Sequence, residues 1–66
     1  ERAPALWASS QFNLALALEV AARTDKTRAI EAVTAARLAL EGFRQVGIAS
    51  YSDRASRLIV RLEALR

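Results

Sequence analysis

Between Ala5 and Glu41 the chain contains neither glycine nor proline, and the whole sequence holds only Pro4, Gly42 and Gly47. Sandwiches and barrels need many turns, and turns depend on the backbone conformations that glycine and proline supply. The 66 residues also include 15 alanines and 9 leucines, which are two of the strongest helix formers. The sequence therefore predicts an all-α fold.

Breaks in this pattern divide the chain into three helices. Pro4 suits a first helical turn, because its missing N–H would have no partner there. A polar stretch at residues 23–27 separates the first two helices, and Gly42 is expected to fray the last turn of the second. We expect antiparallel helices over about residues 4–22, 27–45 and 49–65, joined by short turns. The candidate caps are Asp25 or Thr27 before the second helix, Gly47 in a left-handed conformation after it, and Ser50 or Ser52 before the third.

Each expected helix has an apolar face at helical spacing, and these faces are the candidate core. They are Trp7, Leu14, Leu18 and Ala21 in the first helix, Ala29, Ala32, Ala36, Ala39, Leu40 and Phe43 in the second, and Tyr51, Ala55, Leu58, Leu62 and Leu65 in the third. Because the second face is mostly alanine, a neighbouring backbone can approach it closely.

The first helix has a second apolar face, formed by Ala5, Phe12, Leu16 and Val20. A surface helix of a free-standing bundle normally has a single apolar stripe. Either another helix packs on this second face, or the face is a groove for a partner peptide. The sequence leaves both interpretations open.

Residues 4–19 and 48–63 resemble one another at an offset of 44 residues. Trp7 matches Tyr51, and the pair Leu14 and Leu18 matches the leucines of the third helix. A period of about 20–50 residues in a helical chain is typical of a solenoid repeat.

Residues 7–18, WASSQFNLALAL, resemble the first helix of the bacterial variant of the tetratricopeptide repeat family, which reads roughly W-A-x-x-Q-x-N-L-G-x-A-L, with Ala15 at the glycine position. Residues 30–40, IEAVTAARLAL, resemble the second helix of that repeat, although Ala36 stands where an aromatic is usual. The third helix departs further, since Tyr51 replaces the tryptophan and the spacing exceeds the 34 residues of the family. The resemblance implies that residues 1–66 form a single helical-hairpin domain of order A1-B1-A2, a fragment of an α-solenoid in a longer protein.

The family resemblance also implies a protein–protein interaction scaffold that has no catalysis of its own and no cofactor. Its partner-binding groove would be lined by the inward positions Ser9, Phe12, Asn13, Leu16, Asp53, Ser56, Arg57 and Val60. Asn13 and Arg57 would hydrogen-bond a peptide backbone or carboxylate, although a packing or capping role is the alternative for Asn13. Phe12 occupies the place of the lysine found in carboxylate-clamp members, which argues against that style of recognition.

Other chemistry receives little support. The chain lacks histidine and cysteine, so its serines have no histidine base and no thiolate metal site can form, and we expect no enzyme. Arg54, Arg57 and Arg61 form a basic stripe, which makes a nucleic-acid-binding module one alternative. No aromatic residue is interleaved with the stripe, and Asp53 and Glu63 flank it, so a solvated face or an acidic partner is favoured.

No apolar run approaches the roughly 20 residues of a membrane span, and we expect a cytoplasmic protein. Because Phe12, Leu16 and Val20 lack a covering helix, the fragment is expected to self-associate as a symmetric dimer with the first and third helices near the interface. A purely structural dimerisation module is a further alternative function.

Overall fold

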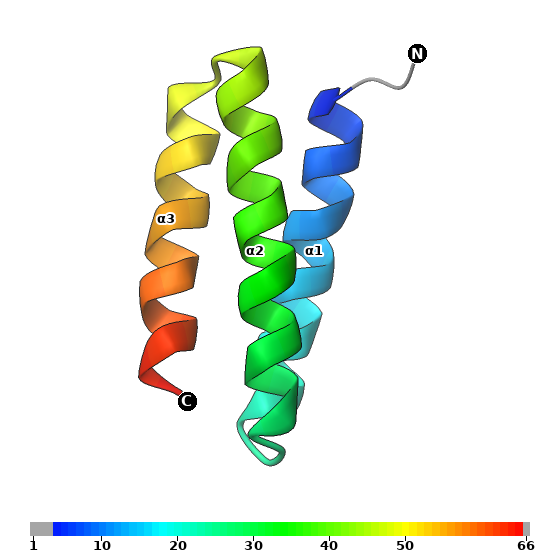
Figure 1. Cartoon of the computed structure of the whole chain (residues 1–66), viewed down its shortest axis with the longest axis vertical. Coiled ribbons are helices and arrows are strands. Elements are labelled where there is room, and N and C mark those ends of the chain that lie inside the picture. Colours follow the sequence, from blue (N-terminus) through cyan, green and yellow to red (C-terminus); the bar gives the residue numbers. More distant parts are fainter. Residues whose placement is uncertain (1–3, 66) are drawn as a thin grey trace.

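The computed structural model describes residues 4–65, which form three α-helices: α1 (Pro4–Ala22), α2 (Thr27–Val46) and α3 (Ala49–Ala64) (Figure 1). In the view of Figure 1 the chain descends through α1, returns upward through α2 and descends again through α3. α2 stands at the centre and packs against both neighbours. The predicted all-α class is confirmed, since the described residues contain no strand, and each helix end lies within one residue of its expected position.

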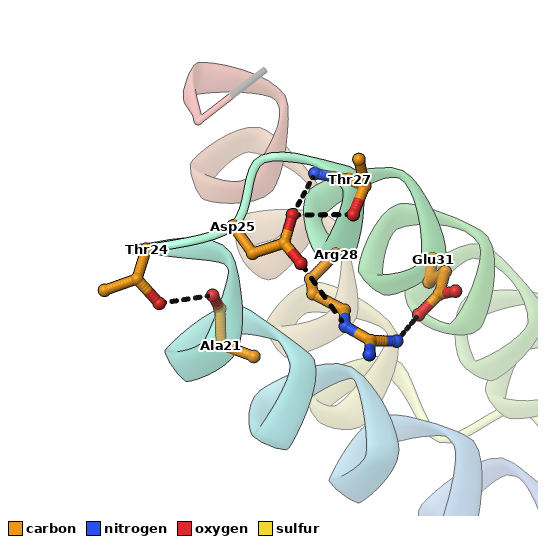
Figure 2. A network of polar contacts seen from close by, with 6 residues as sticks. All are labelled: Ala21, Thr24, Asp25, Thr27, Arg28 and Glu31. Carbon is orange, nitrogen blue, oxygen red and sulfur yellow. Dashed lines mark hydrogen bonds and ion pairs between the residues drawn. The ribbon is translucent and has the colours of Figure 1, made fainter.

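The turn between α1 and α2 is organised by one carboxylate (Figure 2). Asp25 Oδ1 accepts hydrogen bonds from the backbone N–H of Thr27 at 3.1 Å and from its hydroxyl at 2.6 Å. The Arg28 guanidinium lies between two carboxylates: its Nε is 3.9 Å from Asp25 Oδ2, and its Nη1 is 2.9 Å from Glu31 Oε1. Lys26 holds the N-cap position itself and makes no side-chain cap bond. Neither predicted residue is therefore the N-cap of α2: Asp25 lies one position before it and accepts the Thr27 N–H, as expected of a capping carboxylate, and Thr27 is the first residue of the helix.

The turn between α2 and α3 is a tight two-residue connection. Gly47 adopts the left-handed conformation, with φ 71° and ψ 28°. The Gly47 N–H donates to the carbonyl oxygen of Arg44 at 3.1 Å, and the Ile48 N–H donates to the carbonyl oxygen of Phe43 at 3.2 Å. Together these two hydrogen bonds form a Schellman motif. The predicted stop at Gly47 is confirmed, and α2 remains helical through Gly42 rather than fraying there.

The start of α3 differs from expectation. Its N-cap residue is Ile48, which makes no side-chain cap bond, and the predicted serine caps at Ser50 and Ser52 are wrong. Ser52 instead lies inside the helix and donates its backbone N–H to the Ile48 carbonyl at 3.0 Å. The two-residue connection places the helix start too early for either serine to precede it.

Small side chains form the contact between α1 and α2. Ala8, Ala15 and Ala22 are buried, whereas Trp7 is 42% exposed and Leu14 is 48% exposed. The predicted core positions Trp7 and Leu14 are therefore wrong, whereas Leu18 is partly buried and packs against the core. The two helices approach closely at Gly42, where an added Cβ would meet that of Ala8, and large side chains of α1 such as Phe12 and Leu18 pack on either side of this alanine stripe.

The expected faces of α2 and α3 agree better with the structure. Ala29, Ala32, Ala36, Ala39 and Phe43 of α2 are buried, together with Val33, Ala35 and Gly42, which the pattern missed. In α3, Ala55, Leu58 and Leu62 are buried completely, and the two leucines form one cluster with the alanines of α1 and α2. The core is therefore a layer of alanines into which α3 inserts two leucines.

Two ion pairs fasten the C-terminal half of α3 to its neighbours. Arg61 donates to both carboxylate oxygens of Glu19 on α1, at 2.9 and 3.0 Å. Glu63 accepts a bond from Arg37 on α2 at 3.0 Å. Each of these contacts joins side chains that project from different helices and adds a small stabilisation at the edge of the α3 contact.

Candidate functional site: a groove between α1 and α3

A groove of about 380 Å³ opens between α1 and α3, with α2 at its base. Its lining residues come from all three helices: Ser9, Phe12, Asn13 and Leu16 from α1, Phe43 from α2, and Tyr51 and Arg54 from α3. The structure thus brings together the four α1 residues that the sequence placed in a partner-binding groove. It also answers the question of the second apolar face of α1, because Phe12 and Leu16 pack against the core and line the groove at once.

Three aromatic rings form the apolar part of the groove. The Phe12 and Phe43 rings meet edge to face, with centroids 6.2 Å apart, and the Phe43 and Tyr51 rings lie 5.2 Å apart. Phe43 is buried and holds the other two in place, while Phe12 and Tyr51 remain partly accessible. Such ring contacts add about 0.5–1.5 kcal/mol each beyond the area they bury, and they stabilise the arrangement of the three rings.

The polar part of the groove carries a positive charge. Among residues 4–65, Arg54 is its single charged lining residue, and its guanidinium carbon lies 5.8 Å from the centroid of the Tyr51 ring. Ser9 and Asn13 contribute a hydroxyl and an amide on the facing helix. The groove therefore combines one cation, two neutral hydrogen-bonding groups and an aromatic surface.

The four α3 residues predicted for the groove lie elsewhere. Asp53 and Ser56 line a different depression, beside the turn between α2 and α3. Arg57 pairs with Asp53 at 3.0 Å, and Val60 is 70% exposed.

The rotation of α3 explains this difference. Burial of Leu58 turns Tyr51 and Arg54 toward the groove and Arg61 toward Glu19 of α1. Asp53 and Ser56, each two positions from one of the groove residues, point away from it, and Arg57, about 60° from Arg54 around the helix, bonds to Asp53 instead. Matching α3 to α1 by the 44-residue offset therefore did not select Tyr51 and Arg54. The signal that could have found the groove is the pair Tyr51 and Arg54, an aromatic and a cation one turn apart next to the buried leucine line.

The basic stripe of α3 is largely neutralised by the chain itself. Arg61 is held by Glu19 and Arg57 by Asp53, while Arg54 lies over Tyr51. The hydrogen bonds from Arg61 hold the pKa of Glu19 below its ordinary value, and the same bonds raise the pKa of Arg61. Two of the three guanidinium groups thus already have a carboxylate partner, which weakens the case for a phosphate-binding surface.

A second apolar depression, which we call the outer surface, lies between α1 and α2 on the far side of the alanine stripe. It has a volume of about 530 Å³. It is lined by Gln11, Leu14, Leu18, Arg28, Ile30, Glu31, Thr34, Ala35 and Leu38. Leu14 was predicted for the core but is exposed here, whereas Leu18 also packs against the core. Ile30 and Leu38 were not predicted for any site, although their spacing of about two helical turns places them on one face of α2.

Comparison with protein-family models, with curated proteins and with solved structures gives no match. Within residues 4–65, no three acidic side chains lie close enough to hold a metal ion. No helix in this described part combines the length and the apolar character needed to cross a membrane.

Proposed function

We propose that the chain is a protein-interaction module of the tetratricopeptide type, and that the groove between α1 and α3 binds an acidic peptide segment of a partner protein. The observation that carries this proposal is the composition of the groove, in which an aromatic surface adjoins Arg54, the one charged residue of its described lining. Small-molecule and peptide sites usually combine such a concave apolar surface with a few polar groups that fix orientation.

The residues suggest a specific binding mode. An apolar side chain of the partner lies against Phe12 and Leu16, where aromatic and aliphatic surface is still accessible. A neighbouring carboxylate of the partner bonds to Arg54, and the Asn13 amide bonds to the peptide backbone. Hydrogen bonds to a charged group contribute about 1.5–3 kcal/mol each, so the carboxylate supplies the selectivity and the apolar contact supplies buried area.

Local features support the repeat type. Ala8 and Ala15 provide the small side chains that close packing of a helical hairpin requires, and both are buried against α2. Trp7 and Tyr51, which match at the 44-residue offset, are exposed to nearly the same extent and lie against adjacent residues of α2: the Trp7 ring beside Gly42 and the Tyr51 ring on Phe43.

Selection of short random peptides displayed on phage tests this proposal. We expect peptides that pair Asp or Glu with a large apolar residue to be enriched on the wild-type chain. Arg54→Glu should reverse the preference toward basic peptides, and Phe12→Ala should weaken binding of every selected peptide.

Arg57→Glu is the matched control, because Arg57 lies on the same helix outside the groove. It should leave the acidic preference unchanged, provided that circular dichroism shows an intact helix content for each variant. Absence of enrichment on the wild-type chain, or equal effects of the two arginine reversals, would refute the proposed function.

A further inference from the structure

We infer that a side-chain carboxylate of the partner bonds to Arg54 in the same two-bond arrangement in which Glu19 bonds to Arg61. The inference rests on the proposed peptide groove and specifies how that groove recognises an acidic segment. It also sets what the segment must carry, which is a carboxylate and an apolar side chain two positions apart in an extended chain.

One complete ion pair already joins α1 to α3. The Nε and Nη2 atoms of Arg61 donate to the two carboxylate oxygens of Glu19, at 2.9 and 3.0 Å. Two parallel bonds of this kind are geometrically specific to a guanidinium, and a lysine cannot reproduce them. Because α1 and α3 run in the same direction (Figure 1), the pair also shows the register in which their residues face one another.

The same register brings Arg54 opposite Phe12, two helical turns toward the start of both helices. A step of seven residues leaves a side chain within about 20° of its first direction and moves it about 10.5 Å along the helix axis. Arg54 therefore has nearly the direction of Arg61, and Phe12 nearly that of Glu19. The lining of the groove agrees with this register, since it includes both Arg54 and Phe12.

The chain itself supplies no carboxylate at this second position. Phe12 is apolar, and within residues 4–65 Arg54 makes no ion pair, whereas Arg57 on the next turn is held by Asp53 at 3.0 Å. Arg54 is exposed and lies over the Tyr51 ring. A carboxylate that enters from the open side of the groove can therefore form both bonds to its guanidinium.

The position of Leu16 sets the spacing of the two ligand side chains. Leu16 lies four residues beyond Phe12 on α1, so it is about 6 Å along the axis from the level of Arg54. Side chains two residues apart in an extended chain point to the same side and are about 6.6–6.8 Å apart. One extended segment can thus place a carboxylate at Arg54 and an apolar side chain at Leu16.

The width of the groove favours an extended segment over a helix. On the turn of α1 that follows Leu16, the side chains of Glu19 and Arg61 span the gap between α1 and α3. An α-helix with its side chains is about 10–12 Å wide, which exceeds the space left between two helices that one ion pair can bridge. An extended backbone is narrower and can lie along the groove as far as this ion pair.

Three short synthetic peptides test the spacing on the 66-residue chain. Each carries one glutamate and one leucine in a background of serine and glycine, and both ends are capped so that only the side-chain carboxylate is charged. The two residues are adjacent, two positions apart or three positions apart. In fluorescence anisotropy we expect the second peptide to bind about tenfold more tightly than the other two, because only its side chains share one face. Equal affinities, or binding that needs an uncapped C-terminus, would overturn the inference.

Arg54→Lys tests the two-bond arrangement. Lysine keeps the positive charge but offers a single charged point in place of the planar fork. We expect this variant to bind the second peptide about tenfold more weakly. Arg57→Lys is the matched control, because Arg57 lies outside the groove on the same helix, and it should leave the affinity unchanged. Undiminished binding by Arg54→Lys would overturn the inference.

A carboxylate placed on α1 tests the register without any peptide. Phe12→Glu should pair with Arg54, whereas Phe12→Gln removes the same ring and cannot form an ion pair. In urea denaturation at neutral pH, Arg54→Gln should therefore lower the midpoint of Phe12→Glu more than that of Phe12→Gln. Equal effects would overturn the register, and if neither Phe12 variant folds, the Arg54→Lys comparison decides.

The inference and the proposed function fail in different ways. Phage selection that enriches acidic peptides with no preferred spacing would leave the peptide groove standing and would overturn the inference. Absence of acidic enrichment would refute the proposed function, and the inference about the partner with it, even where the Phe12 variants show the expected register.

Discussion

α1 and α3 both pack against α2, but they do so with opposite kinds of side chain. α1 presents alanines, and the approach is so close that a Cβ added to Gly42 would lie 2.7 Å from the Cβ of Ala8. α3 presents Leu58 and Leu62, which insert into the alanine layer and are tied at the edges by ion pairs. Steric exclusion thus controls the first interface, whereas buried apolar area controls the second.

This difference predicts opposite responses to substitution. Removing atoms should damage the interface of α3, because each leucine fills space that its neighbours cannot close. Adding atoms should damage the interface of α1, because no space is left between the backbones. The predictions below test this contrast.

Leu58→Ala should have the largest effect. The substitution removes a fully buried side chain at the centre of the α3 contact, and such changes lower the free energy of unfolding by about 2–5 kcal/mol. Small helical domains have little stability to lose, so we expect α3 to detach or the whole chain to unfold. Urea denaturation followed by circular dichroism measures the change. A loss below about 1 kcal/mol would show that α3 is not held by leucine burial.

Gly42→Ala should have an intermediate effect and tests the other interface. Replacing glycine by alanine within a helix normally adds about 1 kcal/mol of stability. Here the new Cβ would collide with Ala8 and would lie 3.3 Å from the Trp7 ring, and overpacking costs about 1–3 kcal/mol. We therefore expect a net loss of about 1 kcal/mol in thermal or urea denaturation.

The double variant Gly42→Ala with Ala8→Gly provides the control for this collision. It moves the glycine from α2 to α1 and removes the clashing methyl group. Each single substitution should destabilise the chain, and the double variant should be more stable than the sum of the two losses predicts. Strictly additive losses would show that the two positions do not collide.

The same contrast explains how far the sequence predicts the structure. Helix ends follow local rules, and the left-handed stop at Gly47 and the turn at Asp25 were both visible in the sequence. The faces of α2 and α3 follow from helical spacing. The face of α1 does not, because large apolar residues occupy most of its circumference and the alanines that make the contact carry little hydrophobic signal.

The candidate site divides in the same way. The family resemblance assigns Ser9, Phe12, Asn13 and Leu16 of α1 to the groove, and all four line it, because they share one side of a regular helix. On α3 the assignment depended on the rotation of that helix, which is set by how Leu58 and Leu62 fit into alanines of two other helices. Helical spacing gives the relative directions of side chains within a helix, but long-range packing decides which direction faces the groove.

Removing the ion pair between Glu19 and Arg61 should change the free energy of unfolding less than the substitutions above. This change tests how much the edge of the α3 interface adds to the burial of its leucines. The Glu19 side chain is only 14% exposed, and hydrogen bonds from Arg61 hold its pKa below the ordinary value. Because the folded-state pKa is lower than the unfolded one, the stabilisation is present above about pH 4.3, the usual glutamate pKa, and is lost as the pH falls through the folded-state pKa.

We expect Glu19→Gln to lower the free energy of unfolding by about 1 kcal/mol or less at neutral pH and to reduce this acid-dependent loss. Thermal denaturation of the wild-type chain and Glu19→Gln across the acid range measures the difference, with Glu41→Gln on the exposed side of α2 as the matched control. Curves that remain parallel through the acid range would show that Glu19 does not couple α3 to α1, and the attachment of α3 would then depend on leucine burial alone.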